Sequence, residues 1–110
     1  MKRDTNLFIQ DILESIKDIE SFSKGLAKEK FISNKLKQNA IIRSLEIIGE
    51  AVKQIPEEFR QQHPQVRWRD IGDMRNILIH VYFDIDYKIV WKTATELIPQ
   101  LKKQIKELMN

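Results

Sequence analysis

The chain has 110 residues and a mass of 13.1 kDa, which is enough for one folded domain and too little for two. Its 42% hydrophobic and 32% charged residues exclude a disordered tail and a membrane-embedded protein. The absence of cysteine excludes a disulfide framework, a thiolate metal site and a cysteine nucleophile, and it makes the cytoplasm the expected location. No apolar run approaches the roughly 20 residues that span a bilayer, so no membrane partner is expected. The net charge of +3 permits an anionic partner without requiring one.

The first element is expected to be an amphipathic helix. Apolar residues recur at spacings of three and four from Thr5 to Ser23. Asp4 or Thr5 can cap the start of this helix, and Gly25 stands where a left-handed residue would end it. Residues 26–33 have only a weak pattern, which indicates a connection with room for one helical turn.

A second long helix and a short one are predicted next. The long helix covers residues 34–55, with Asn34 as its cap and Pro56 as its stop. Pro56-Glu57-Glu58 is typical of the first turn of a short helix, with proline at the first helical position and acids near the positive end. His63-Pro64 should end that helix.

Two more helices complete the expected architecture. One is predicted over residues 70–81, and Asp86 should cap a last helix that continues to Leu108 with a kink at Pro99. With only three Gly and three Pro, the chain is expected to be all-α. The prediction is one domain, residues 1–110, folded as an up-and-down bundle of four main helices plus one short extra helix.

The second helix carries more isoleucine than one packing face needs. Ile41 and Ile48 share one face of this helix, whereas Ile42 and Ile47 lie well off it. A second buried surface is therefore expected, and a homodimer would provide it.

The candidates for chemistry gather in one stretch of the sequence. His63 and His80 lie in different elements and in no metal-binding spacing, so neither a metal site nor a cofactor is expected. The chain also lacks glycine-rich phosphate-binding loops and a nucleophile elbow. The remaining polar cluster consists of Arg67, Trp68, Arg69, Asp70, Asp73, Arg75, Asn76, His80, Tyr82 and Asp84.

This cluster fits the requirements of metal-free RNA cleavage. Four of the six arginines lie between Arg60 and Arg75, and a guanidinium presents a planar fork to phosphate oxygens. Asn76 and His80 are four residues apart, so the amide can orient the imidazole. His80 can then act as base or acid, and Arg75 can stabilise the phosphorane charge. One such histidine per chain is short of one proton-transfer group, which a symmetric dimer would supply.

Each of these residues also has a structural interpretation, and spacing alone leaves the choice open. A single helical histidine is more often packed or solvated than catalytic, and arginines commonly pair with acids such as Asp70 and Asp73. Tyr82 is by default a helix-end residue with its hydroxyl in water. The large apolar side chains are expected in the core instead of forming a stacking platform for bases: Trp68, Ile71, Met74, Leu78 and Trp91.

The octet RNILIHVY, residues 75–82, fits the pattern R-N-x-x-x-H-x-Y, and the surrounding sequence extends the match. The stretches NAIIRSLEIIGEAVKQIP (39–56), VRWRDIGDMRNILIHVYFDIDYKIVW (66–91) and ELIPQL (96–101) resemble successive blocks of one family. Over nearly its full length, the chain resembles the HepT-type toxins of the HEPN superfamily.

The resemblance implies a helical bundle that dimerises with two R-x4-H motifs facing across a cleft. It implies the toxin of a type II toxin–antitoxin system, a metal-independent ribonuclease acting on tRNA or mRNA. Arg75 and His80 take the catalytic positions, and Asn76 the polar position beside the arginine. The resemblance also implies a cognate MntA-type nucleotidyltransferase antitoxin, which inactivates the toxin by transferring AMP from ATP to Tyr82.

Two positions depart from the family pattern. Arg67 stands where proline is frequent, and Val81 replaces a frequent glycine just before the tyrosine. The alternative hypothesis is a non-catalytic helical partner or substrate-binding subunit of a nucleotidyltransferase, which explains the fold and charge equally well. The intact motif favours the toxin, because an adaptor needs no such residues at that spacing.

Overall fold

The computed structural model of the chain describes residues 4–80 and 85–109, with the backbone alone from 75 to 80. These residues contain helices and no strands, so the predicted all-α class is confirmed. The elements are α1 (Thr5–Ser23), α2 (Lys28–Ile32), α3 (Lys35–Gln54), α4 (Glu57–Gln62), α5 (Trp68–His80), α6 (Tyr87–Lys92), the π-helical segment η1 (Thr93–Leu97) and α7 (Ile98–Leu108).

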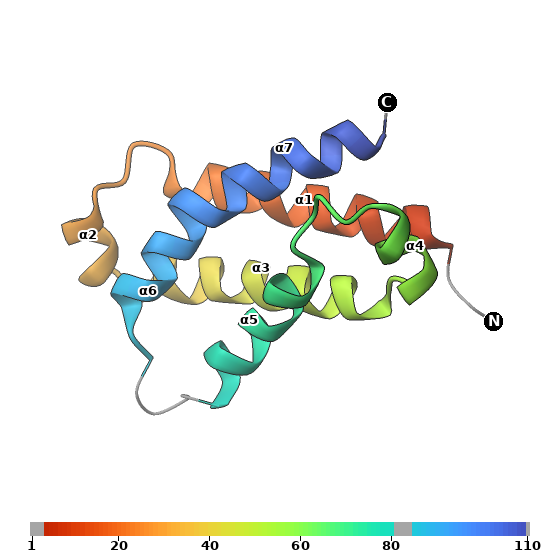
Figure 1. Cartoon of the computed structure of the whole chain (residues 1–110). Coiled ribbons are helices and arrows are strands. Elements are labelled where there is room, and N and C mark those ends of the chain that lie inside the picture. The colour runs from red at the N-terminus through yellow and green to blue at the C-terminus, as the bar shows by residue number, and fades with distance from the viewer. Residues whose placement is uncertain (1–3, 81–84, 110) are drawn as a thin grey trace.

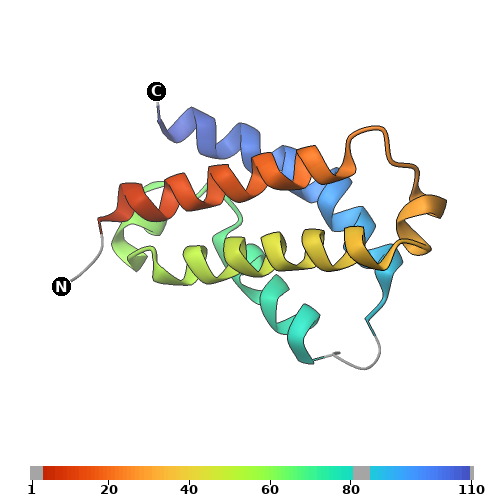
Figure 2. The same cartoon turned by 180° about the vertical axis from the view of Figure 1, so that it is seen from behind.

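The long helices run in alternating directions, as an up-and-down bundle requires. α1 and α3 are antiparallel and pack along their lengths, and α7 lies against α1 (Figures 1 and 2). α5 packs on α3 at a slant, so its C-terminal end projects to the edge of the molecule (Figures 1 and 2). α2 closes one end of the bundle against α3 and α6.

One continuous apolar cluster holds these helices together. It joins side chains that are 0 or 1% exposed, including Ile12, Leu45, Ile48, Ile71, Leu101 and Ile105. A surface ion pair between Lys102 and Glu20 (2.8 Å) also links α7 to α1. Within the described residues, no helix combines the length and apolar character needed to cross a bilayer.

The additional isoleucine side chains of α3 are largely buried within the single chain. Ile42 is 8% exposed and belongs to the core, and Ile47 is half-buried. α3 packs against α1, α2 and α5, so it buries more than one stripe without a second copy of the protein. The isoleucines of α3 therefore do not by themselves require a homodimer, which stays a prediction.

The predicted helix caps are confirmed. Gly25 has a φ of +68°, the left-handed conformation that glycine adopts without steric cost, and the chain turns there after α1. Side-chain oxygens accept the capping bonds at three N-termini: Asp4 from the N–H of Asn6 (2.9 Å), Asn34 from Lys37 (3.0 Å) and Asp86 from Lys88 (2.9 Å).

The weakly patterned connection contains a helix of its own, α2. Phe31 is fully buried and supplies the apolar contact, and its ring lies 5.1 Å from that of Trp91. The buried amide of Gln38 donates to the carbonyls of Phe31 (3.0 Å) and Ile32 (2.8 Å), which satisfies the C-terminal end of α2. The bundle therefore has two short extra helices, α2 and α4, where one was expected.

Two boundaries differ from the prediction by one or two residues. Pro56 is the N-cap of α4 and not its first helical residue. α5 begins at Trp68 instead of residue 70, because Arg67 already supplies the first helical carbonyl to the N–H of Ile71 (3.1 Å). The predicted C-terminal residue of this helix, Val81, lies outside the described residues.

The irregularity predicted at Pro99 takes the form of the π turn η1. Pro99 has no N–H to donate to the carbonyl of Thr95, four residues earlier, and its ring crowds that carbonyl. The wider turn that precedes α7 relieves this conflict. The hydroxyls of Thr93 and Thr95 donate to the carbonyls of Ile89 and Trp91, both at 2.8 Å.

Leu45→Ala is expected to destabilise the protein by about 2–5 kcal/mol, because it removes a fully buried side chain from the centre of α3. Chemical denaturation monitored by circular dichroism measures this change. Leu36→Ala is the matched control in the same helix, since Leu36 is 78% exposed and should change stability by about 0.5 kcal/mol or less. Equal effects of the two substitutions would contradict the assigned core.

Candidate functional site

The predicted catalytic positions all lie on one continuous helix. Arg75, Asn76 and His80 belong to α5, and 76 and 80 are separated by one turn. Positions 75 and 80 are about 140° apart around the axis, so they flank a common side of the helix. Tyr82 lies outside the described residues, and so does Val81 before it. The structure thus confirms that residues 75–80 of the motif are helical. The side chains of these residues are not among the described ones.

The packing of α5 leaves exposed the side of its first half that carries Arg69 and Asp73. Ile71 and Met74 are buried on the side that faces the bundle. Arg69 and Asp73, on the opposite side, are exposed, and helical periodicity places positions 76 and 80 on the same stripe as these two. The end of α5 that carries the motif is at the molecular edge (Figures 1 and 2).

Aromatic contacts fix the start of α5. The indole Nε1 of Trp68 donates to the carbonyl of His63 (2.9 Å), and Trp68 is only 6% exposed. The ring of Phe59 lies 4.6 Å from the His63 ring and 6.3 Å from that of Trp68. These contacts lock α4 and its connection against α5, which confirms the core interpretation of Trp68.

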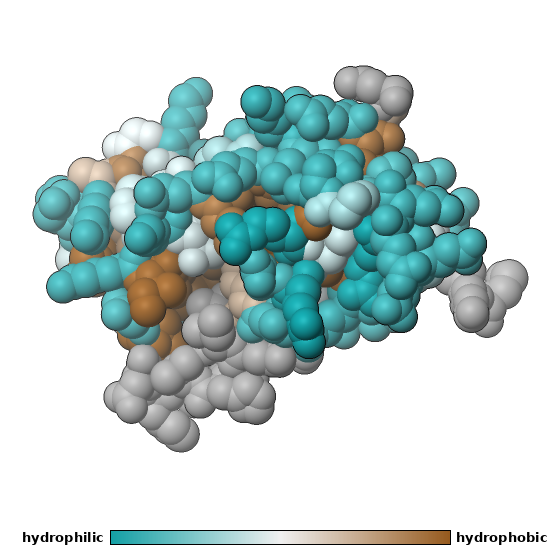
Figure 3. Space-filling view, viewed as in Figure 1, coloured by the Kyte–Doolittle hydropathy of each residue, from teal (hydrophilic) through white to brown (hydrophobic). Residues whose placement is uncertain are grey.

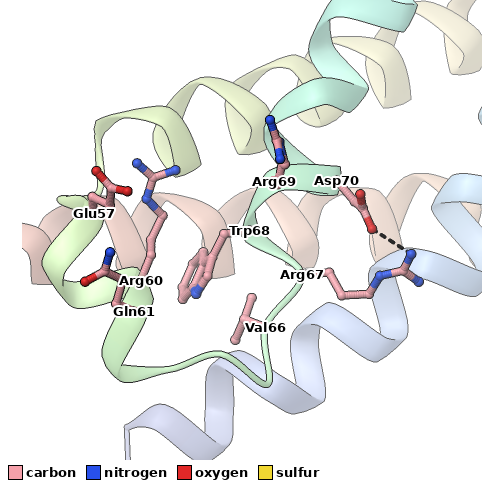
Figure 4. Close-up of a pocket in the computed structure, with 8 residues that line it drawn as sticks. All are labelled: Glu57, Arg60, Gln61, Val66, Arg67, Trp68, Arg69 and Asp70. Carbon is pink, nitrogen blue, oxygen red and sulfur yellow. Dashed lines mark ion pairs between the residues drawn. The ribbon is translucent and has the colours of Figure 1, made fainter.

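A pocket of about 620 Å³ opens between α4 and the first turn of α5, as Figure 4 shows. It lies at the opposite end of α5 from the R-x4-H motif. Arg67 forms an ion pair with Asp70 (2.6 Å) at its rim. The lining residues are Glu57, Arg60, Gln61, Val66, Arg67, Trp68, Arg69 and Asp70.

The other two arginines of this pocket lack ion-pair partners within residues 4–80 and 85–109. The Nε–H group of Arg60 is buried and donates to no hydrogen-bond acceptor among those residues. Arg69 is exposed on α5. Among the described side chains, no three His, Cys, Asp or Glu lie close enough to hold a metal ion. The lining of this pocket thus carries three arginines, Arg60, Arg67 and Arg69, and two carboxylates, Glu57 and Asp70.

A second pocket, of about 320 Å³, adjoins the first through Arg67. It lies between the start of α5 and the helices near the C-terminus, and its wall includes Lys92 and the half-exposed Ile89. Figure 3 shows an apolar patch over α6, where Ile89 is 51% exposed, within a largely hydrophilic face.

The sequence placed Arg67, Arg69 and Asp70 in the polar cluster and Arg60 among the four neighbouring arginines, but it did not place Arg60 beside the others in space. Arg60 comes from α4, seven residues before Arg67, and only the fold brings it to the same pocket. The clustering of four arginines between residues 60 and 75 was the available signal.

Comparison with known proteins gives the family. Residues 12–108 match the family described as HepT-like ribonucleases. The chain belongs to this family. A protein of Thermococcus cleftensis named "Probable ribonuclease HepT" is 45% identical over 108 residues, which cover 98% of both chains. A protein of Methanocaldococcus jannaschii named as a "Putative RNase" is 47% identical over 104 residues, covering 94% of this chain and 95% of the relative. No solved structure matches the chain significantly.

The family match covers the candidate motif and nearly all of the helices. It extends from the middle of α1 to the end of α7 and includes the whole octet at residues 75–82. The resemblance inferred from the motif blocks is thereby confirmed at the level of the family. Residues 1–11 and 109–110 lie outside the matched range.

Proposed function

We propose that this protein is the ribonuclease toxin of a type II toxin–antitoxin system and that it cleaves tRNA or mRNA in the cytoplasm without a metal ion. Its membership of the HepT-like ribonuclease family, with Arg75, Asn76, His80 and Tyr82 intact at the family spacing, supports this most directly. The slanted α5, whose motif-bearing end projects to the edge of the molecule, is consistent with a site that opens to a large substrate.

In the proposed reaction, an RNA 2′-hydroxyl attacks the adjacent phosphorus. A base takes the hydroxyl proton as the new P–O bond forms, and an acid gives a proton to the 5′-oxygen as the old P–O bond breaks. The products are a 2′,3′-cyclic phosphate and a free 5′-hydroxyl. His80 supplies proton transfer, Arg75 neutralises the phosphorane, and Asn76 orients the imidazole.

A homodimer completes the proton-transfer pair. Each chain contributes one His80, so two copies that face each other provide both the base and the acid. The position of the motif at the edge of the molecule makes such pairing sterically simple. The burial of Ile42 inside one chain means that the dimer interface should involve α5 more than α3.

Multi-angle light scattering at micromolar concentration is expected to give about twice the chain mass of 13.1 kDa. His80→Ala should leave this value unchanged, since the substitution removes a polar group of the site and not the helix. A clean monomer at concentrations that support cleavage would contradict the composite site.

The proposal includes regulation by a partner encoded nearby. A cognate MntA-type nucleotidyltransferase would transfer AMP from ATP to Tyr82, two residues after His80 in sequence. The hydroxyl oxygen of Tyr82 attacks the α-phosphorus of ATP, pyrophosphate leaves, and the phenolic proton is lost to solvent or a base of the partner.

The direct test is incubation of the purified protein with total RNA in the presence of EDTA. Fragments with 2′,3′-cyclic phosphate ends support the proposal. Intact RNA, at protein concentrations where the dimer is present, would contradict it and favour the non-catalytic partner of a nucleotidyltransferase.

A further inference from the structure

We propose that the pocket between α4 and the start of α5 is a second phosphate-binding subsite, which holds the RNA backbone at a distance from the cleaved bond. The inference rests on the proposed function, because it takes RNA as the ligand. Its two principal contacts are Arg60 and Arg69. Arg67 also lines the pocket, but its guanidinium is paired with Asp70.

The guanidinium of Arg60 is not fully used by hydrogen bonds within the described residues. Its Nε is buried without an acceptor among the described residues, and such an unsatisfied donor is unfavourable. Figure 4 shows the Arg60 side chain rising between Trp68 and Glu57, both of which also line the pocket. Arg60 as a whole is only part-buried, so a phosphate oxygen in the pocket would pair with the accessible part of its guanidinium.

The lining of the pocket suits a phosphodiester better than a stacked base. Trp68, the aromatic residue of its wall, is buried and uses its Nε1 on the His63 carbonyl, so its ring offers no exposed stacking face. Arginine forks bind phosphate bidentately, whereas base recognition from one side needs an exposed aromatic surface.

Helical periodicity places the subsite and the R-x4-H motif on the same helix, α5, at its two ends. Arg69 stands on the same stripe as positions 76 and 80, and eleven residues of helix separate Arg69 from His80 by about 16 Å. Asp73 lies between them and is exposed, and its carboxylate repels phosphate. An RNA strand that runs past α5 would therefore contact the subsite and the motif through phosphates that are a few nucleotides apart.

The Arg67–Asp70 ion pair sets the strength of this subsite. Asp70 holds the Arg67 guanidinium at 2.6 Å and places a carboxylate at the pocket rim. Removing that carboxylate frees Arg67 for phosphate and removes a repulsion, so the loss of Asp70 and the loss of a phosphate-binding arginine such as Arg69 should have opposite effects on RNA affinity.

The chain offers matched controls for the loss of a positive charge and for the loss of a negative charge. Arg43 and Glu46 form another ion pair at the same spacing of three residues, on α3 and outside the pocket lining. Arg69→Gln and Asp70→Asn are therefore compared with Arg43→Gln and Glu46→Gln, which change the net charge equally.

The probe is a fluorescent single-stranded RNA of about 12 nucleotides with 2′-O-methyl groups throughout, which cannot be cleaved because it has no 2′-hydroxyl nucleophile. Arg69→Gln should weaken binding about 3- to 10-fold and reduce the slope of log K against log salt by about 0.7. Asp70→Asn should strengthen binding, and the two α3 variants should differ from wild type by less than twofold. Arg69→Gln or Asp70→Asn behaving like its α3 control would overturn the subsite.

A cleavage assay separates this inference from the proposed function. On a long RNA, Arg69→Gln should raise KM with little change in kcat, and on a dinucleotide, which has no distant phosphate, it should match wild type. Wild-type cleavage with no effect of Arg69→Gln would remove the subsite and leave the ribonuclease. If Arg69→Gln weakens RNA binding, Arg43→Gln does not, and the wild-type protein cleaves no RNA, the subsite stands and the ribonuclease proposal is contradicted.

Discussion

His80→Ala is expected to reduce RNA cleavage by about 10²- to 10⁴-fold, because it removes the proton-transfer group of the proposed reaction. Arg75→Ala should cause a loss of about 10²- to 10³-fold, since it removes the cation that neutralises the phosphorane. Rates are measured by gel in the presence of EDTA, and the unchanged helical circular dichroism of each variant shows that folding is intact.

His63→Ala is the matched control, because His63 is the other histidine of the chain. Its ring packs on Phe59. Its hydrogen bond with Trp68 is made by its backbone carbonyl, which the substitution keeps. This variant should cleave at the wild-type rate with a small loss of stability. Wild-type rates for His80→Ala, or inactivity of His63→Ala in a folded protein, would contradict the assignment.

Tyr82→Phe is expected to abolish neutralisation by the cognate nucleotidyltransferase and ATP while the protein still cleaves RNA. One AMP on the tyrosine adds a phosphodiester with about one negative charge and a bulky nucleoside. The charge competes for the guanidinium that an RNA phosphate needs, and the nucleoside obstructs entry. Inhibition then requires no unfolding.

Tyr87→Phe is the control, since Tyr87 is the second of the two tyrosines and starts α6 directly after the Asp86 cap. It should accept one AMP and lose activity like wild type. Intact-mass spectrometry after incubation with the partner and ATP gives the result. An adduct on Tyr87, or none on the wild-type chain, would refute the switch.

The helices and their ends were predictable from sequence because their causes are local. A cap such as Asp4, Asn34 or Asp86 bonds to an N–H two or three residues away, so the sequence contains the whole interaction. The motif at residues 75–80 belongs to the same category, since helical spacing alone relates its members. The α2 helix was underestimated because its stability depends on the burial of Phe31 and the distant Trp91.

By itself, then, the sequence determined the all-α class, the α5 helix beneath the motif and the family. Only the tertiary structure decided that Ile42 is used inside one chain, and that Arg60 of α4 joins Arg69 of α5 in one pocket. The physical reason is range. Periodicity and capping act within about four residues, whereas burial and pocket formation depend on which surfaces of separate helices are packed together.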